Sequence, residues 1–247
     1  MNRVLAVAAL MALGACSDQI HLGTDPNYWS ADFEGGDLSE WGEGGPTAGG
    51  QALSANAQLT VVNSPTHSGR FAAKSAIFAA GKNEYTRLYR WGTLPNDAYF
   101  KVWMWIPARY TIGLYWNVFE FQGRGDPAAP VTLKYLWSLD LEQAPNGEMS
   151  WYLFDGQRQH KYLPAVTTVA PIGRWFLVEA FLHQATDNTG RIAFWIDGAP
   201  LLEVTGVSTV PSAWLSWDVG GVAPDITQQP AELYLDDAAI ARVGPEK

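Results

Sequence analysis

Cysteine is almost absent from this sequence, and its single occurrence is Cys16. One thiol cannot form an internal disulfide or a multi-cysteine metal site. The chain also lacks an HExxH pair and a glycine-rich phosphate loop with its lysine, which argues against the common zinc-protease and nucleotide-binding sites. The four histidines are scattered along the chain. We therefore expect a domain held together by its own apolar core.

Basic residues are scarce. Lysine and arginine together number 16 against 25 aspartates and glutamates, giving a formal net charge of −9. Such a chain does not attract nucleic acid or anionic lipid through its overall charge, so we expect no nucleic-acid partner. A strongly polyanionic substrate would require a local basic cleft.

Long apolar runs are missing, apart from a short one at the N-terminus. Arg3 precedes the apolar run 4–13, which is shorter than the ~20 residues that span a bilayer and is typical of a secretory signal. The four residues ending at Cys16 (LGAC) resemble a bacterial lipobox. The resemblance implies a signal peptide at 1–15, a lipid on Cys16 and a tether at 16–28. The alternative is an ordinary signal peptide followed by an accidental cysteine.

The lipobox also predicts where the protein is located. A lipid on Cys16 implies an exported protein anchored to a bacterial membrane and facing the periplasm or the cell surface. Ser17, rather than aspartate, follows the cysteine, which by the family's sorting rule favours the outer membrane.

A helical stripe is also missing from the rest of the chain, where short alternating segments are separated by Gly, Pro, Asn and Asp. This pattern is typical of strands joined by turns. We predict strands at 29–34, 58–63, 70–78, 84–91, 97–106, 116–122, 132–142, 148–154, 174–184, 191–197, 201–205, 215–219 and 231–241. Their number and the short turns favour a single all-β domain over 29–243, built as an antiparallel sandwich. We expect it to be monomeric.

Alternation within strands assigns side chains to two faces. The odd positions of 132–142 form an apolar core face (Leu133, Tyr135, Trp137, Leu139, Leu141). The even positions include a polar set (Lys134, Ser138, Asp140, Glu142). Other strands carry tryptophan on the face expected to meet solvent, and the chain has 12 tryptophans in all. Because a solvated sheet face rarely carries so many, we expect something to bind there.

Several motifs, taken in order, resemble one known family. They are DFEGGDLSEW at 32–41, SP with SGRFAA within 64–73, WNVFEFQ at 116–122, GRW at 173–175, GRI with WIDG within 190–198, and LYLDD at 233–237. Their order over roughly 30–242 is similar to that of concanavalin A-like jelly rolls related to heparin lyase. The resemblance implies the fold but not the activity, because this architecture hosts lyases, hydrolases, lectins and inert modules.

Recognition of a polysaccharide is the function we favour from the sequence. It requires an aromatic platform with hydrogen-bonding side chains around it. The candidate glycan-binding residues are Tyr89, Lys101, Trp103, Trp105, Trp116, Glu120, Asp140, Arg191 and Trp195. A non-catalytic lipoprotein that uses the same face for a protein partner is a further alternative.

Polysaccharide lyase activity on an acidic glycan is the enzymatic alternative. A lyase must neutralise a carboxylate, remove the adjacent proton and protonate the leaving oxygen. Arg87, Gln122, Lys134 and His183 are the candidates for these roles. A glycoside hydrolase of this fold would carry Glu-x-Asp-x-x-Glu on one strand. Here Asp140 and Glu142 lack the upstream glutamate, because Ser138 stands in its place.

Cofactors are not required by any motif in the sequence. The family resemblance implies that a structural calcium ion could join the first strand to the last through hard oxygen ligands. Glu34 and Asp237 lie in the matching segments. The alternative is that Asp237 caps a turn or pairs with an arginine.

Overall fold

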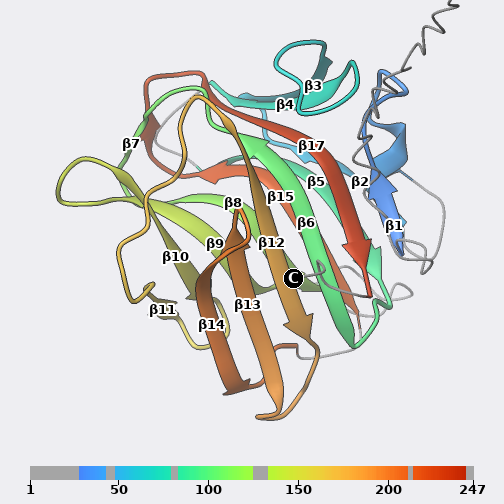
Figure 1. The fold of residues 1–247 in the computed structure, drawn as a ribbon, viewed down its shortest axis with the longest axis vertical. Coiled ribbons are helices and arrows are strands. Elements are labelled where there is room, and N and C mark those ends of the chain that lie inside the picture. The colour runs from blue at the N-terminus through green and yellow to red at the C-terminus, as the bar shows by residue number, and fades with distance from the viewer. Residues whose placement is uncertain (1–27, 43–47, 79–82, 125–132, 211–213, 243–247) are drawn as a thin grey trace, which may run out of the picture.

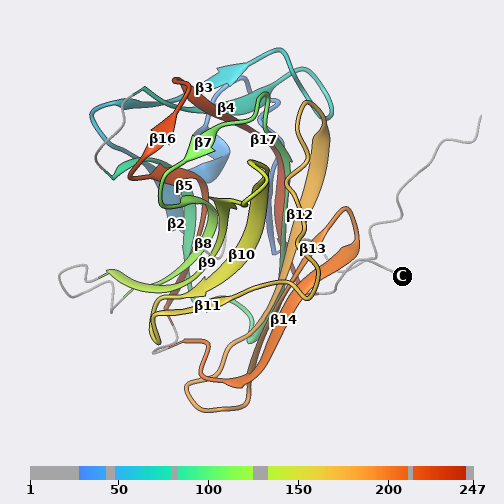
Figure 2. The same ribbon diagram turned by 90° about the vertical axis from the view of Figure 1, so that its left-hand side faces the viewer.

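Two antiparallel sheets pack face to face in the computed structural model of the protein, which describes residues 28–42, 48–78, 83–124, 133–210 and 214–242. The eight-stranded sheet has the order β14-β13-β12-β6-β17-β4-β3, with β1 paired to β17, and the seven-stranded sheet has the order β11-β10-β9-β8-β15-β5-β2. Figures 1 and 2 show the two layers and the curvature of the seven-stranded sheet. This architecture confirms the predicted all-β antiparallel sandwich of jelly-roll type.

The strands of the eight-stranded sheet are β1 (Trp29–Ala31), β3 (Ala57–Val62), β4 (Ala72–Ile77), β6 (Asp97–Trp105), β12 (Trp175–His183), β13 (Gly190–Ile196), β14 (Ala199–Val207) and β17 (Ala231–Ala241). The seven-stranded sheet contains β2 (Ala48–Leu53), β5 (Glu84–Gly92), β8 (Trp116–Arg124), β9 (Leu133–Gln143), β10 (Met149–Asp155), β11 (His160–Tyr162) and β15 (Leu215–Ala223). A small separate ladder joins β7 (Thr111–Ile112) to β16 (Ile226–Thr227), and a 3-10 turn, η1, covers Ser39–Trp41.

Most predicted strands exist within a few residues of their expected ends. The alternation in β6 places Phe100, Val102 and Met104 in the core. Phe176 and Val178 of the neighbouring strand β12 lie beside them on the same face of the sheet. The strands that the sequence patterns missed are β2, β7, β11 and β16. Strand β2 begins at Ala48 in a glycine-rich stretch that shows no alternation, and β7 and β16 have two residues each, too few to show a period.

Aromatic rings fill the space between the two sheets. Phe100 of the eight-stranded sheet packs edge to face against Phe121 of the seven-stranded sheet, with ring centroids 4.8 Å apart. Trp217 lies 5.4 Å from Phe100 and 5.5 Å from Phe119. Offset and edge-to-face pairs of this kind add to the burial energy. The core therefore fixes the curvature and position of the seven-stranded sheet, whose other face carries the candidate site.

No helix among the residues described is both long enough and apolar enough to cross a membrane. Cys16 and the expected signal peptide lie outside the described residues.

Candidate functional site

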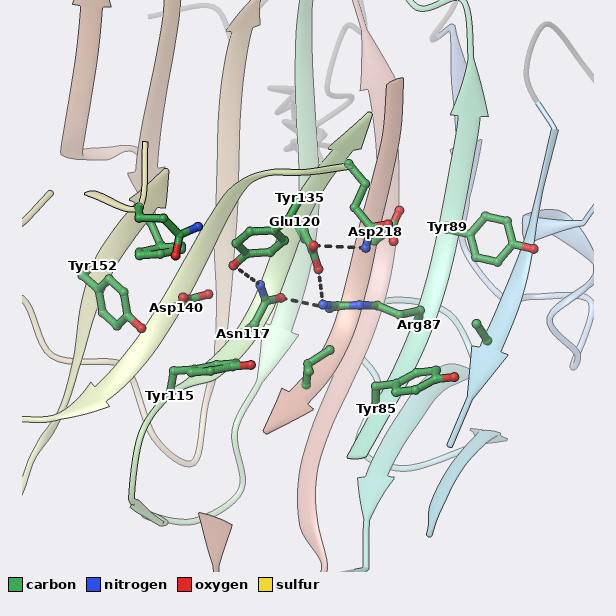
Figure 3. Close-up of a pocket in the computed structure, with 15 residues that line it drawn as sticks. Tyr85, Arg87, Tyr89, Tyr115, Asn117, Glu120, Tyr135, Asp140, Tyr152 and Asp218 are labelled. Carbon is green, nitrogen blue, oxygen red and sulfur yellow. Dashed lines mark hydrogen bonds and ion pairs between the residues drawn. The ribbon is translucent and has the colours of Figure 1, made fainter. Parts of the chain in front are cut away.

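A groove of about 710 Å³ lies on the face of the seven-stranded sheet that points away from the core. Its lining combines tyrosines with amide and carboxylate side chains, as Figure 3 shows. The lining residues are Ala52, Tyr85, Arg87, Tyr89, Tyr115, Asn117, Glu120, Gln122, Tyr135, Asp140, Tyr152, Phe154, Gln159, Asp218 and Val222. We call this site the groove.

Strand pairing arranges much of the groove lining in two rows across the sheet. One row runs through Tyr152, Asp140, Asn117, Val222 and Tyr85. The next runs through Phe154, Ser138, Glu120, Asp218 and Tyr89. Residues directly opposite one another have Cβ atoms ~4.5–5.5 Å apart. The pairing therefore brings residues from five strands into one continuous polar floor.

A bulge at Val118 decides which side chains of β8 enter the groove. Asn117 pairs with Asp140 and Phe119 with Leu139, so Val118 is an extra residue without its own partner. An extra residue reverses the alternation beyond it. Asn117 therefore shares the groove with Glu120, whereas Trp116 points into the core and is only 1% exposed. The expected place of Trp116 in a solvent-facing glycan platform is wrong for this reason.

A second bulge has the same effect on β9. Phe121 pairs with Trp137 and Gln122 with Tyr135, which leaves Leu136 as the extra residue. Tyr135 consequently lines the groove instead of the core, which corrects the face expected for it. Lys134, one residue earlier, is exposed and is not part of the groove lining. The sequence pattern offered no sign of either bulge.

Arg87 is the only cation among the described residues that line the groove. It extends over β15 to reach two side chains of β8, as Figure 3 shows. Its Nη1 donates to Asn117 Oδ1 at 2.9 Å, and its Nη2 forms an ion pair with Glu120. The other Glu120 oxygen accepts from Gln122 Nε2 at 3.0 Å.

Two acceptor atoms in the groove have no partner within the described structure. They are Asp140 Oδ1 and Gln122 Oε1, both buried. A buried acceptor without a donor costs about 1–3 kcal/mol, so such atoms need an explanation. Their position in an open groove supplies one, because a hydroxyl-bearing ligand can donate to both.

Burial changes the protonation of the groove carboxylates. It raises the pKa of Glu120 to about 7; Arg87 opposes this rise and the nearby Asp218 adds to it. Burial also raises the pKa of Asp140 to about 6, partly offset by the hydroxyls of Ser138 and Tyr152. Loss of water disfavours the charged form of an acid. Near neutral pH the groove can therefore hold Glu120 as a neutral acid and Asp140 as a carboxylate.

Two tyrosines of the groove, Tyr135 and Tyr152, keep their protons. Burial, together with the negative charge of Asp140, raises the pKa of both Tyr135 and Tyr152 above the ordinary tyrosine value. The Tyr135 hydroxyl accepts from Asn117 Nδ2 at 3.4 Å and contacts the Ser138 hydroxyl. Both phenols are suited to donate a proton rather than to remove one.

The groove brings together only part of the residue set expected from the sequence. Arg87, Gln122, Tyr89, Glu120 and Asp140 line it. His183 does not, because it lies on β12 of the other sheet, where its Nδ1 is 2.8 Å from Asp97 Oδ1. The polar and aromatic groove residues missed by the sequence patterns are Tyr85, Tyr115, Asn117, Tyr135, Tyr152, Phe154, Gln159 and Asp218.

The remaining platform residues lie on the opposite side of the sandwich. Lys101, Trp103, Trp105, Arg191 and Trp195 belong to β6 and β13 and alternate with core residues of the eight-stranded sheet. The expected single platform is therefore divided between the outer faces of two sheets.

The carboxylates expected to bind calcium are already engaged by the protein. Glu34 Oε1 accepts the backbone N–H groups of Arg70 and Phe71 at 2.7 and 2.9 Å. Asp237 Oδ2 lies 2.6 Å from His67 Nδ1. No group of three or more His, Cys, Asp and Glu side chains within the described ranges could hold a metal ion. These contacts hold the loop between β3 and β4 in place.

Solved structures share this fold. An endo-β-1,4-glucuronan lyase from the fungus Trichoderma reesei matches with a TM-score of 0.63 at 15% identity, covering 88% of this chain and 96% of that chain. Alginate lyases from a Chlorella virus and from Aplysia kurodai each match with a TM-score of 0.56 at 12% identity, over 88% and 89% of this chain and 100% of theirs. Neither a protein-family model nor a curated protein matches the sequence. Identities this low establish the shared fold alone.

Proposed function

We propose that the groove binds a uronic-acid polysaccharide and cleaves it by β-elimination. One observation carries the proposal. Arg87 with two amide side chains, an unpartnered carboxylate oxygen of Asp140 and two protonated tyrosines converge in one open groove. These are the three functions that elimination requires: neutralisation of the substrate carboxylate, a base and an acid. The fold shared with glucuronan and alginate lyases is compatible with this chemistry.

Neutralisation of the substrate carboxylate falls to Arg87, Asn117 and Glu120. Arg87 and Asn117 supply N–H donors, whereas an ionised Glu120 would repel an anionic sugar. Its raised pKa of about 7 allows Glu120 to become neutral and to donate a hydrogen bond in place of a negative charge. Protonation of Glu120 also releases the Arg87 guanidinium for the incoming carboxylate.

Proton transfer follows from the remaining groups. Asp140 removes the proton from C5 of the uronate, and the electron pair of that C–H bond forms the C4–C5 double bond. The C4–O4 bond breaks, and O4 takes a proton from Tyr135 or Tyr152. Atoms and charge balance. After product release Asp140 loses the proton that it gained, and the tyrosine regains a proton, which restores the starting state.

Hydrolysis is the second candidate, favoured by one specific observation. Glu120 and Asp218 are directly opposite one another on β8 and β15. This pairing sets the two acidic side chains next to each other on one face of the sheet, and retaining glycosidases use a pair of neighbouring carboxylates ~5–5.5 Å apart. The excess of acidic over basic side chains in the groove also suits a neutral sugar.

Product analysis separates these functions. The full chain is incubated with alginate, β-1,4-glucuronan and neutral β-glucans, and both new reducing ends and the ultraviolet absorbance of an unsaturated uronate are measured. The proposal expects both signals on a uronate polymer. Reducing ends without the absorbance identify a hydrolase. Binding without product on every polymer identifies a glycan-binding protein and overturns the proposed cleavage.

We also propose that the domain acts outside the cytoplasm, held to a membrane through a lipid on Cys16. The support is the lipobox-like sequence that ends at Cys16. A polysaccharide too large to cross a membrane can be bound only outside the cytoplasm. An exported, membrane-anchored domain would be located there.

A further inference from the structure

Four half-buried tryptophans lie on the outer face of the eight-stranded sheet, on the side of the sandwich opposite the groove. Trp103 and Trp105 belong to β6, Trp175 to β12 and Trp195 to β13. Figure 1 shows these three strands side by side, as their pairing requires. Because each tryptophan alternates with buried core residues, its side chain points away from the core. None of the four contributes to the groove lining.

The strand register sets the dimensions of this tryptophan face. Trp175 is paired with Trp105, and their ring centroids are 5.8 Å apart at an interplanar angle of 72°. Trp195 is paired with Glu179, four residues further along β12 than Trp175. At ~3.3 Å per residue the two ends of the face are ~13 Å apart along the strand. The surface is therefore extended rather than a pocket for one small group.

Two polar groups within the tryptophan face make no hydrogen bond to any residue that the structure describes. Glu179 is only 5% exposed. Among the described charged side chains, Lys101 is the one whose positive charge attracts its carboxylate. No ion pair or hydrogen bond joins Glu179 to another residue within the described ranges. The indole Nε1 of Trp175 is buried and also lacks an acceptor there. Burial raises the pKa of Glu179.

An open sheet face ordinarily leaves its carboxylates in water, so a nearly buried carboxylate and a buried indole N–H beside flat apolar rings favour a complementary ligand. Sugar rings have that chemistry, because one face of a pyranose is apolar while its edge carries hydroxyl groups that both donate and accept. A second copy of this chain would supply apolar area, but at a net charge of −9 per chain it would also be repelled.

We propose that the tryptophan face is a second glycan-binding site, in which Trp105, Trp175 and Trp195 stack on sugar rings and Glu179 accepts a sugar hydroxyl. This site does not compete with the groove for space, because the two lie on the outer faces of different sheets. It would retain a polysaccharide at the protein surface whether or not the groove cleaves it. The inference therefore stands independently of the proposed elimination.

Affinity electrophoresis of the full chain in gels containing alginate, β-1,4-glucuronan or a neutral β-glucan tests the proposal. Glu179→Gln keeps the size of the side chain, and Trp175→Ala removes a ring. Each is expected to weaken retention at least tenfold, while cleavage of short oligosaccharides in the groove stays at the wild-type level. Glu203→Gln is the matched control, because Glu203 lies two strands away in an exposed ion pair with Arg191 at 2.7 Å. This control is expected to bind like the wild type.

Circular dichroism and sedimentation of the same variants complete the test. If Trp175→Ala misfolds, Glu179→Gln and Trp195→Ala decide the question. Wild-type retention in correctly folded Glu179→Gln and Trp195→Ala proteins overturns the proposal. So does the absence of retention of the wild type by every polymer, or a wild-type dimer that Trp195→Ala converts into a monomer.

Discussion

Arg87 on β5 and Glu120 on β8 form an ion pair across the intervening strand β15. Both side chains are almost fully buried, with 7% and 3% of their area exposed. A buried ion pair contributes little net stability, yet removal of one partner leaves an uncompensated charge. The pair therefore makes the floor of the groove sensitive to the protonation of Glu120.

Replacement of Arg87 is expected to destabilise the protein in a pH-dependent manner. Arg87→Met leaves Glu120 buried without its counter-charge, and the expected loss at pH 8 is about 3–5 kcal/mol of unfolding free energy. Protonation of Glu120 relieves the loss at pH 5. Urea unfolding at the two pH values measures the difference. The double variant Arg87→Met/Glu120→Leu, which buries no charge, is the control. Equal losses at both pH values would show that Glu120 is not the group responsible.

The proposed elimination is expected to have a bell-shaped pH dependence. Asp140 must be deprotonated to act as a base, so activity falls as the pH drops below its pKa of about 6. Glu120 must be protonated to accommodate the substrate carboxylate, so activity falls as the pH rises above about 7. The pH dependence of kcat/KM reports the pKa values of both groups in the free enzyme. Glu120→Gln should remove the alkaline limb alone, and an unchanged alkaline limb in that variant would contradict its assignment.

Asp140→Asn is expected to lower kcat about 10²–10⁴-fold without unfolding the protein, because it removes the base and keeps the shape of the side chain. Glu142→Gln is the matched control. Glu142 lies two residues away on β9 and pairs with Lys161 outside the groove lining. Tyr135→Phe and Tyr152→Phe, measured separately, identify the proton donor. Full activity of Asp140→Asn would exclude Asp140 as the base.

Trp116→Ala is expected to cost about 3–5 kcal/mol of unfolding free energy, since it creates a large core cavity. Trp116 is 1% exposed and packs edge to face against Tyr110, with ring centroids 5.3 Å apart. Chemical denaturation measures the cost, and Trp195→Ala on the tryptophan face serves as the surface comparison. If Trp116→Ala instead abolished glycan binding at unchanged stability, the burial described here would be contradicted.

Cys16→Ala is expected to release the protein from the membrane. The proposed lipid is attached to Cys16, the only thiol in the chain, and stable anchoring requires more than one acyl chain. Incorporation of labelled palmitate and fractionation of cells expressing the chain measure the effect. Ser17→Ala, one residue later, is the control and should remain lipidated. Membrane retention of an unlabelled Cys16→Ala protein would favour a different anchor.

Local patterns in the sequence determined the fold class and most of the strands. In β6 and β12 the alternation of apolar and polar residues alone predicts which side chains are buried, because successive strand residues point to opposite faces. No knowledge of distant contacts is required. The same rule correctly placed Trp137, Leu139 and Leu141 in the core. Five of the candidate residues chosen from the sequence also line the groove: Arg87, Gln122, Glu120, Asp140 and Tyr89.

Only the tertiary structure decided which of these residues lie together. Two single-residue bulges, at Val118 and Leu136, placed Asn117 and Tyr135 in the groove and directed Trp116 into the core. A bulge depends on pairing with the neighbouring strand, so the strand's own residues do not reveal it. Alternation likewise predicts that a side chain points away from the core, but it does not predict to which of the two sheets the strand belongs. Sheet assignment follows from long-range pairing, which is why one expected platform became a groove on one side and a tryptophan face on the other.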